Sequence, residues 1–259
     1  MSMLPQLNRI SWLIASVGVF LLFIALWHFI AQARLVSPVF LPGPDRAWDA
    51  LVYGLTQGDL KAKTLATVER MFYGWLLASL AGIVIGAMIG VSATARAYAG
   101  PTLEFLRPLP ASAMMPVAIA ILGLTDAMVL AVIAFGALWP MLLATVHGFA
   151  AVEPRLYQVS RALGLSYRAV IFKIALPSAM PDILSGMRVG LTIALILAVV
   201  GEMLASRPGL GQAILLAARS FQSADLYAGV ILLGLIGYVS STLLTLVEMR
   251  VLRWRAVPR

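Results

Sequence analysis

Apolar runs of about twenty residues recur along the whole chain, and each is long enough to cross the ~30 Å hydrocarbon core of a bilayer. Hydrophobic residues make up 61% of the chain and charged residues 12%, whereas soluble domains carry about 25% charged residues. Backbone groups in hydrocarbon must pair internally, and the alternating pattern of a membrane β-barrel is absent. We therefore expect an all-α polytopic membrane protein with one transmembrane domain over residues 1–259.

Six segments are predicted to span the membrane: Ile10–Ala31, Met71–Ala93, Thr102–Leu124, Met128–Phe149, Ile183–Leu204 and Leu226–Val247. The first has an alternative interpretation as a cleaved secretory signal, because residues 31–33 read Ala-Gln-Ala and Arg9 precedes the apolar run. That run is longer than the about 7–15 apolar residues of a signal peptide, and Trp12 and Trp27 lie near its ends like interfacial anchors. We therefore expect a retained span.

The distribution of lysine and arginine predicts the orientation of these segments. With the N-terminus in the cytosol, most basic residues lie on the cytosolic side, as the positive-inside rule requires. Six spans return the C-terminus to the cytosol, so the loop 151–177 between the fourth and fifth spans also faces inward. Headgroup contacts at the span ends explain the formal net charge of +8. Lipid is an expected partner, and nucleic acid is not.

Helix-end signals frame a short helix within the loop 151–177. Pro154 suits the first turn of a helix, where a backbone N–H has no intrahelical partner, and Gly164 suits the left-handed residue after a helix end. These two residues predict a helix over Arg155–Leu163. Such a short helix is marginal alone in water, so its apolar residues need a protein partner.

Three further short helices are expected outside the spans. Ser166 can cap one that runs to about Ala175, and Pro177 would stop or kink it just before the fifth span. The other two are the amphipathic stretches Arg46–Leu55 and Gln212–Arg219, each preceded by a Pro-Gly break.

The loop also carries a spaced motif. Gly164 is followed, after nine residues, by Ile-Ala-Leu-Pro at 174–177, while residues 158–160 read Gln-Val-Ser. The spacing resembles the Glu-Ala-Ala loop of ABC importer permeases, in which a coupling helix docks into a groove of the ATPase subunit, although the residues that name the motif differ here. The resemblance implies ATPase-coupling roles for Tyr157, Arg161, Gly164, Ile174, Leu176 and Pro177.

Other stretches extend this resemblance over nearly the whole chain. They are residues 40–44, 67–70 and 106–110, Pro116, Gly123, Glu202 and residues 209–211. Together they are similar to the nitrate, sulfonate and taurine class of these permeases. The resemblance implies a translocation path or gate that includes Arg107, Pro108, Pro110, Pro116, Glu202, Gly209 and Gly211.

Several of these residues also have a purely structural interpretation. The three prolines can be simple kinks in the third span or can break it where it enters the translocation path. Glu202 follows a long apolar run, and we expect it to brace the outer gate. Five other charged residues lie near predicted span ends, and most of them are expected to be interfacial; they are Glu104, Arg107, Asp182, Arg188 and Glu248. The glycines at 82, 86 and 90 predict close helix packing, with substrate lining as the alternative.

No catalytic or metal-binding pattern emerges from the sequence. His28 and His147 are far apart on separate spans, and no paired catalytic carboxylates or Ser/His/Asp order are found. The sequence lacks a Gly-rich phosphate loop that ends in Lys-Ser or Lys-Thr, so ATP must bind to another polypeptide. We expect no enzyme activity and no cofactor on this chain, with ATP and Mg²⁺ on a partner ATPase.

The resemblance implies the permease subunit of an ABC importer in the bacterial inner membrane. It implies as partners a second permease subunit, expected to be an identical copy, two ATPase subunits, and a periplasmic or lipid-anchored substrate-binding protein. The solute would be a small anion of the sulfonate, nitrate or taurine kind. An ion-driven secondary transporter and an intramembrane enzyme remain as alternatives, but the ionisable pairs or paired catalytic residues that they need are scarce here.

Overall fold

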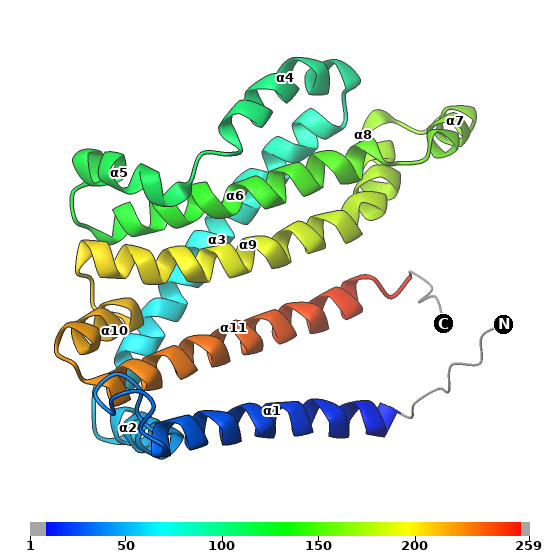
Figure 1. The fold of residues 1–259 in the computed structure, drawn as a ribbon. Coiled ribbons are helices and arrows are strands. Elements are labelled where there is room, and N and C mark those ends of the chain that lie inside the picture. Colours follow the sequence, from blue (N-terminus) through cyan, green and yellow to red (C-terminus); the bar gives the residue numbers. More distant parts are fainter. Residues whose placement is uncertain (1–8, 255–259) are drawn as a thin grey trace. The chain divides into compact units, whose positions relative to one another are not determined.

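The computed structural model describes residues 9–254, and helices account for most of them (Figure 1). No strand occurs among these residues, which confirms the expected all-α class. In chain order the elements are α1 (Arg9–Gln32), α2 (Pro44–Thr56), α3 (Leu60–Gly90), α4 (Ala93–Leu106), η1 (Ala111–Met114), α5 (Met115–Leu122), α6 (Asp126–Ala150), α7 (Pro154–Ala162), α8 (Tyr167–Val170), η2 (Ile171–Ala175), α9 (Leu176–Ala205), α10 (Leu210–Arg219) and α11 (Ser223–Val251).

Five helical segments are long and apolar enough to cross a membrane: Ile14–Gln32, Leu60–Gly90, Asp126–Ala150, Tyr167–Ala205 and Ser223–Val251. A sixth crossing is formed if α4 and the helical segment Ala111–Leu122 are counted together, and these two parts are bent by 79° at their junction. Outside the spans, α2 and α10 lie where short helices are expected.

The bent segment differs from the single helix expected over Thr102–Leu124. The chain leaves the helix after Leu106 and re-enters helical structure at Ala111. Pro108 and Pro110 lie in this gap, and neither has the backbone N–H that would continue an α-helix. Pro116 is not a kink, because it lies in the first turn of α5, where a missing N–H costs nothing.

The chain divides into two compact units. The first consists of residues 1–61 and 213–231 and so contains α1, α2, most of α10 and the start of α11. Within it, the indole Nε1 of Trp27 donates to the carbonyl of Pro42 at 3.0 Å. The Trp27 ring also stacks on Tyr227 with 5.6 Å between ring centroids. These contacts fix the end of α1 against the turn that precedes α2.

The second unit consists of residues 62–212 and 232–259 and is built around α3, α6 and α9. Glycines bring these helices into close contact, which confirms the expected packing role of the series on α3. A methyl group added at Gly82 would lie 3.0 Å from Met141 Cβ, and one added at Gly90 would lie 2.7 Å from Phe149 Cβ. On α9, Gly186 meets the α6 backbone in the same way. Small residues allow membrane helices to approach this closely.

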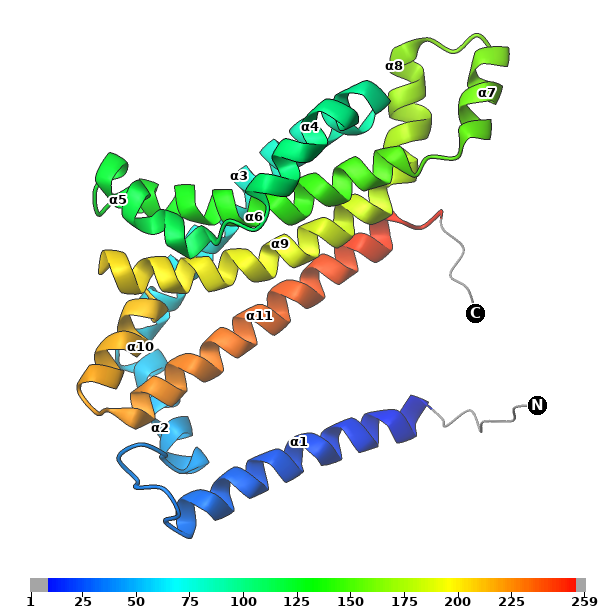
Figure 2. The same ribbon diagram turned by 45° about the horizontal axis from the view of Figure 1, so that its top comes forward.

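These contacts also give the direction of the three helices. Residue numbers rise together along α3 and α6, whereas they fall along α9, so α3 and α6 are parallel and α9 is antiparallel to both. Figure 2 shows α6 beside α9 over most of their length. The N-termini of α3 and α6 therefore meet the C-terminus of α9 at one end of the unit. The loop 151–177 lies at the other end, about 37 Å away along α6.

Candidate functional site

The loop 151–177 turns a sharp corner at Gly164. Helix α7 ends at Ala162, and Gly164 follows with a left-handed φ of 63°. Its N–H donates to the carbonyl of Arg161 at 3.1 Å, and the N–H of Leu165 donates to that of Ser160 at 3.0 Å. This pair of bonds is the Schellman motif, which satisfies the free carbonyls of the last helical turn. The helix predicted from Pro154 and Gly164 is therefore present, within one residue at each end.

The second helix of the loop begins at Ser166, as predicted. The Ser166 hydroxyl accepts a hydrogen bond from the Ala169 N–H at 3.4 Å. Of the two effects expected of Pro177, a stop or a kink, the stop is not observed, because helical structure continues without a break from Tyr167 to Ala205. A π-helical turn, η2, precedes Pro177, and the N–H of Leu176 donates to Ile171, five residues back. The wider turn accommodates the missing N–H of Pro177 inside the helix.

Apart from Pro177, the residues expected to couple to an ATPase fall into two groups. Tyr157, Ile174 and Leu176 pack against a buried cluster at the base of the loop, made of Phe149, Val152, Ala175, Ala179 and Ile183. Arg161 and Gly164 lie at the exposed corner instead. Partial burial raises the pKa of the Tyr157 phenol, and the nearby positive charge of Arg96 opposes that rise.

The outer face of α7 is apolar and exposed. Exposure is 39% for Leu156, 54% for Val159 and 69% for Leu163. A hollow of about 650 Å³ runs between the opposite side of α7 and the α8–η2 segment, and it is lined in part by Tyr157 and Arg161. A surface helix normally turns its apolar side toward protein. This face is therefore the part of the loop suited to contact another subunit.

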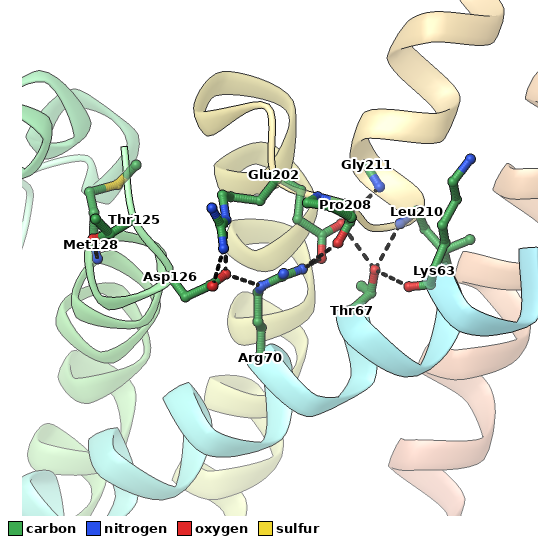
Figure 3. Close-up of polar contacts among 11 residues, drawn as sticks. Lys63, Thr67, Arg70, Thr125, Asp126, Met128, Glu202, Pro208, Leu210 and Gly211 are labelled. Carbon is green, nitrogen blue, oxygen red and sulfur yellow. Dashed lines mark hydrogen bonds and ion pairs between the residues drawn. The ribbon is translucent and has the colours of Figure 1, made fainter. Parts of the chain in front are cut away.

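At the opposite end of the unit, Glu202 lies at the centre of a buried polar cluster (Figure 3). Its side chain is fully buried. The carboxylate accepts hydrogen bonds of 2.9 Å from the Thr67 hydroxyl, from Arg70 Nη1 and from the Gly211 N–H. A buried carboxylate is stable only with such partners, so these bonds connect α9 to α3 and to the start of α10.

Arg70 extends the cluster to α6. Its Nε lies 2.9 Å from Asp126 Oδ1, and its Nη1 donates to the Pro208 carbonyl at 2.7 Å. Asp126 also forms an ion pair with Arg207, which lies in the turn after α9. Two arginines and two carboxylates therefore alternate across the ends of α3, α6 and α9.

Two of the predicted gate glycines belong to this cluster. A methyl group at Gly209 would lie 2.2 Å from Glu202 Cδ, and one at Gly211 would lie 2.2 Å from the Val199 carbonyl oxygen. Glycine is required at both positions because the backbone passes directly over the Glu202 carboxylate and the last turns of α9.

The sequence interpretation found Glu202, Gly209 and Gly211 but missed their charged partners. From the sequence, Thr67 and Arg70 belong only to a stretch that resembles the permease family, and Asp126 and Arg207 are not predicted to be functional. One signal in the sequence points to these partners. Arg70, Asp126, Glu202 and Arg207 are charges of opposite sign near span ends that are expected on the same side of the membrane. Asp126 even follows Thr125, whose hydroxyl caps α6.

Another ion pair joins Arg188 of α9 to Glu248 of α11. In the described residues 9–254, no group of three or more His, Cys, Asp and Glu side chains could hold a metal ion.

Three of the four remaining predicted path residues lie at the break between α4 and η1, and the fourth, Pro116, lies in the first turn of α5. Arg107 is the residue after α4, and Pro108 and Pro110 occupy the gap. They are separate from the Glu202 cluster in sequence and in their helix contacts. Arg107 lines a hollow of about 590 Å³ whose other walls come from α6 and α9.

Comparisons with known proteins agree on one family. A family model described as "Binding-protein-dependent transport system inner membrane component" matches residues 78–253. The putative aliphatic sulfonates transport permease protein SsuC of Bacillus subtilis (strain 168) is 32% identical over 232 residues, which cover 90% of this chain and 84% of the relative. The taurine transport system permease protein TauC of Escherichia coli (strain K12) is 26% identical and covers 92% of this chain and 89% of its own length.

The same type of protein is found among other relatives and solved structures. The nitrate import permease protein NrtB of Leptolyngbya laminosa is 26% identical over 90% of this chain and 85% of its own length. A chain of the inward-facing MetNI methionine ABC transporter superposes with a TM-score of 0.64 at 17% identity, over 80% of this chain and 98% of that one. Because the MetNI chain is only 17% identical, its likeness to this chain concerns the fold alone.

Proposed function

Because this chain belongs to the family of binding-protein-dependent transport system inner membrane components, we propose that it conducts a small anion across the membrane. As a family member it is a transmembrane permease subunit of an ATP-driven ABC importer and has no ATPase site of its own. Relatives named for aliphatic sulfonates, nitrate and bicarbonate support an anionic solute. Its substrate is a small sulfonate or a similar oxyanion.

The proposal that this loop couples the permease to the ATPase rests on the corner at Gly164. It holds the apolar face of α7 (Leu156, Val159 and Leu163) outward, while Tyr157, Ile174 and Leu176 fix the loop to the buried base. The ATPase subunit docks on that face. Movement of the docked helix passes into α9, because the helix from Tyr167 to Ala205 is continuous. Coupling needs one docked element with two positions that the nucleotide state biases.

At the other end of the unit, the Glu202 cluster braces the outer gate. Its hydrogen bonds and ion pairs connect the ends of α3, α6 and α9, and a change in the position of α9 must break or rearrange them. The loop 151–177 then faces the cytosol together with both termini, and the Glu202 end faces the substrate-binding protein. The assembly is a pair of identical permeases with two ATPases in a bacterial inner membrane.

Uptake in proteoliposomes tests the function. The permease is reconstituted with its ATPase and binding protein, and uptake of labelled ethanesulfonate, nitrate and bicarbonate is measured with ATP present. Uptake of at least one anion should require both ATP and the binding protein and should persist when proton and sodium gradients are collapsed. Uptake that follows an ion gradient without ATP would instead support a secondary transporter.

A further inference from the structure

The break between α4 and η1 lies halfway along the neighbouring helices of the second unit. Ala111, the first residue after the break, packs against Gly136, where an added methyl group would lie 2.8 Å from Ala111 Cβ. Gly136 occupies the middle of α6. The non-helical residues 107–110 therefore lie at mid-depth of the unit, so Arg107 differs from the expectation that it lies near a span end. Irregular backbone at such a depth is tolerated in a bilayer where it is buried in protein or lines a watery cavity.

A cavity is present at this point. The hollow of about 590 Å³, called the central hollow below, lies between the break and the middle of α6 and α9. It is lined by Arg107, Leu109, Ala111, Ser112, Gly136, Trp139, Pro140, Leu143, Ile193, Ile196 and Leu197. Most of these residues are apolar, and none of the described lining residues is acidic.

Two side chains that line the central hollow, Trp139 and Arg107, carry hydrogen-bond donors. Trp139 contributes a buried indole Nε1 that has no hydrogen-bond partner within residues 9–254. Arg107 forms no ion pair in that range, unlike Arg70, Arg188 and Arg207, which all pair with carboxylates. A buried N–H without a partner is rare and costly in a folded protein.

Helix geometry adds to the donors at this wall. Ser112 lies in the first turn of the helical segment that starts at Ala111. The first N–H groups of a helix have no intrahelical acceptors and carry a partial positive charge. The Ser112 hydroxyl is a further donor. The wall thus presents one fixed cation and several donors without a fixed anion to balance them.

We propose that the central hollow is an anion-binding subsite of the translocation path, with Arg107 and Trp139 as the ligands of a sulfonate-like oxyanion. The proposal rests on the proposed function and adds where the solute binds within the permease. Arg107 neutralises the charge of the anion at mid-depth, the Trp139 N–H donates to one of its oxygens, and Leu143 and Ile196 surround its alkyl group. A sulfonate has three acceptor oxygens and one charge, which matches this set of donors.

Direct binding to the permease–ATPase complex without the binding protein tests the subsite. The complex is placed in phosphatidylcholine nanodiscs, and the Kd of radiolabelled ethanesulfonate is measured by equilibrium binding. Arg107→Gln should raise the Kd roughly ten- to hundredfold, the range expected for a lost charge-assisted hydrogen bond. Trp139→Phe keeps the ring and should raise the Kd roughly three- to tenfold. Neutral ethanesulfonamide should not compete.

A matched control separates binding from folding. Trp75→Phe removes an indole N–H that donates to the Met187 carbonyl at 3.0 Å, away from the central hollow. This variant should lower the Tm of the complex and leave the Kd for ethanesulfonate unchanged. Trp139→Phe should raise the Kd and leave the Tm unchanged, because the Trp139 N–H has no partner within residues 9–254 that the substitution would remove. If Arg107→Gln does not fold, the Kd for ethanesulfonate is measured in Arg107→Lys and Trp139→Phe instead.

Four results would overturn the subsite. The first is an unchanged Kd in both Arg107→Gln and Trp139→Phe, and the second is equal competition by ethanesulfonamide. The third is that the wild-type complex binds none of ethanesulfonate, nitrate and bicarbonate. The fourth is loss of binding in discs that contain phosphatidylglycerol, which would assign the donors to a lipid headgroup. ATP-dependent uptake by the complete wild-type transporter is measured in parallel. If that uptake is intact while any of the four results holds, the transport function stands and only the subsite fails.

Discussion

The Nη1 atom of Arg70 lies 2.9 Å from Oε1 of Glu202, and the Glu202 side chain has no solvent exposure. The same guanidinium contacts Asp126 through Nε, so one arginine holds carboxylates from two other helices. A buried charge is tolerated only when it is paired and hydrogen-bonded, and removal of one partner leaves the other uncompensated. The end of the unit that carries Glu202 is therefore sensitive to the loss of one charge.

Glu202→Gln should destabilise the permease and weaken its coupling. Glutamine keeps the shape and an acceptor for Thr67, but it leaves Arg70 with Asp126 as its only carboxylate. We expect a loss of about 3 kcal/mol, near the lower end of the range for breaking a buried ion pair, and a lower ratio of uptake to ATP hydrolysis. Thermal unfolding and uptake measure the two effects. Glu69→Gln, at an exposed position on α3, is the control, and unchanged uptake and coupling in Glu202→Gln would show that Glu202 does not brace the gate.

Gly164→Ala should uncouple transport from hydrolysis without affecting membrane insertion. No neighbouring atom would touch the added methyl group, so the cost comes only from the left-handed φ of 63°. That cost is about 1–2 kcal/mol for alanine. Gly100→Ala is the matched control, because its methyl group also meets open space but its backbone is helical. Equal ratios of uptake to ATP hydrolysis in the two variants would contradict a role for the corner.

Pro177→Ala should also reduce coupling, through the π-helical turn. Alanine restores the N–H that proline lacks, so the turn around Ile171–Ala175 can relax to a regular α-helix. Such a relaxation rotates the residues before it, including Tyr167, relative to α9. The amount of permease in the membrane should be normal, while uptake per ATP hydrolysed should fall. Normal uptake in both Pro177→Ala and Gly164→Ala would remove the assignment of this loop to coupling.

Val159→Asp should prevent the ATPase from co-purifying with the permease. Val159 lies on the exposed apolar face of α7, and a buried charge at such an interface is costly. Gln158→Glu adds the same charge one residue away, at the first of the three positions that give the Glu-Ala-Ala loop its name, and should keep the ATPase bound. Pull-down of the ATPase from detergent extracts measures both. Loss of the ATPase from both variants would indicate a general effect of charge instead of a docking face.

Gly86→Ala should destabilise the packing of α3 on α6. The added methyl group would lie 2.7 Å from the Leu142 carbonyl oxygen and 2.7 Å from Thr145 Cβ. Overpacking of this kind costs about 1–3 kcal/mol. Gly234→Ala on α11 is the control, because nothing lies within 4 Å of its added methyl group. A thermal unfolding temperature of Gly86→Ala equal to that of the control would show that the helices can separate at no cost.

Local chemistry explains what could be predicted from the sequence. Pro154, Gly164 and Ser166 act within a few residues of themselves, so the ends of α7 and the start of α8 follow from their backbone preferences. The apolar runs likewise predict helices of membrane-spanning length. The six-span count depends on the break at Pro108 and Pro110, where the sequence allowed either a kink or an interruption.

Contacts between distant helices could not be predicted in the same way. Thr67 and Arg70 are 135 and 132 residues from Glu202, and their meeting requires α9 to run antiparallel to α3 in one particular register. Nothing in the local sequence specifies that register. The π-helical turn could not be predicted for a related reason. The local sequence allows Pro177 to stop or kink a helix, and the tertiary packing of Ile174 and Ala175 decides that the helix continues.

The glycines at 82, 86 and 90 have a mechanical consequence. They leave no layer of side chains between the backbones of α3 and α6, and side chains are the compliant part of most helix contacts. Without that layer, the two helices have little freedom to absorb a relative displacement by changing rotamers. A displacement next to Phe149 should therefore reach Asp126, about 35 Å away along α6. Stiffness of this kind is what allows a lever to act over the full thickness of a membrane.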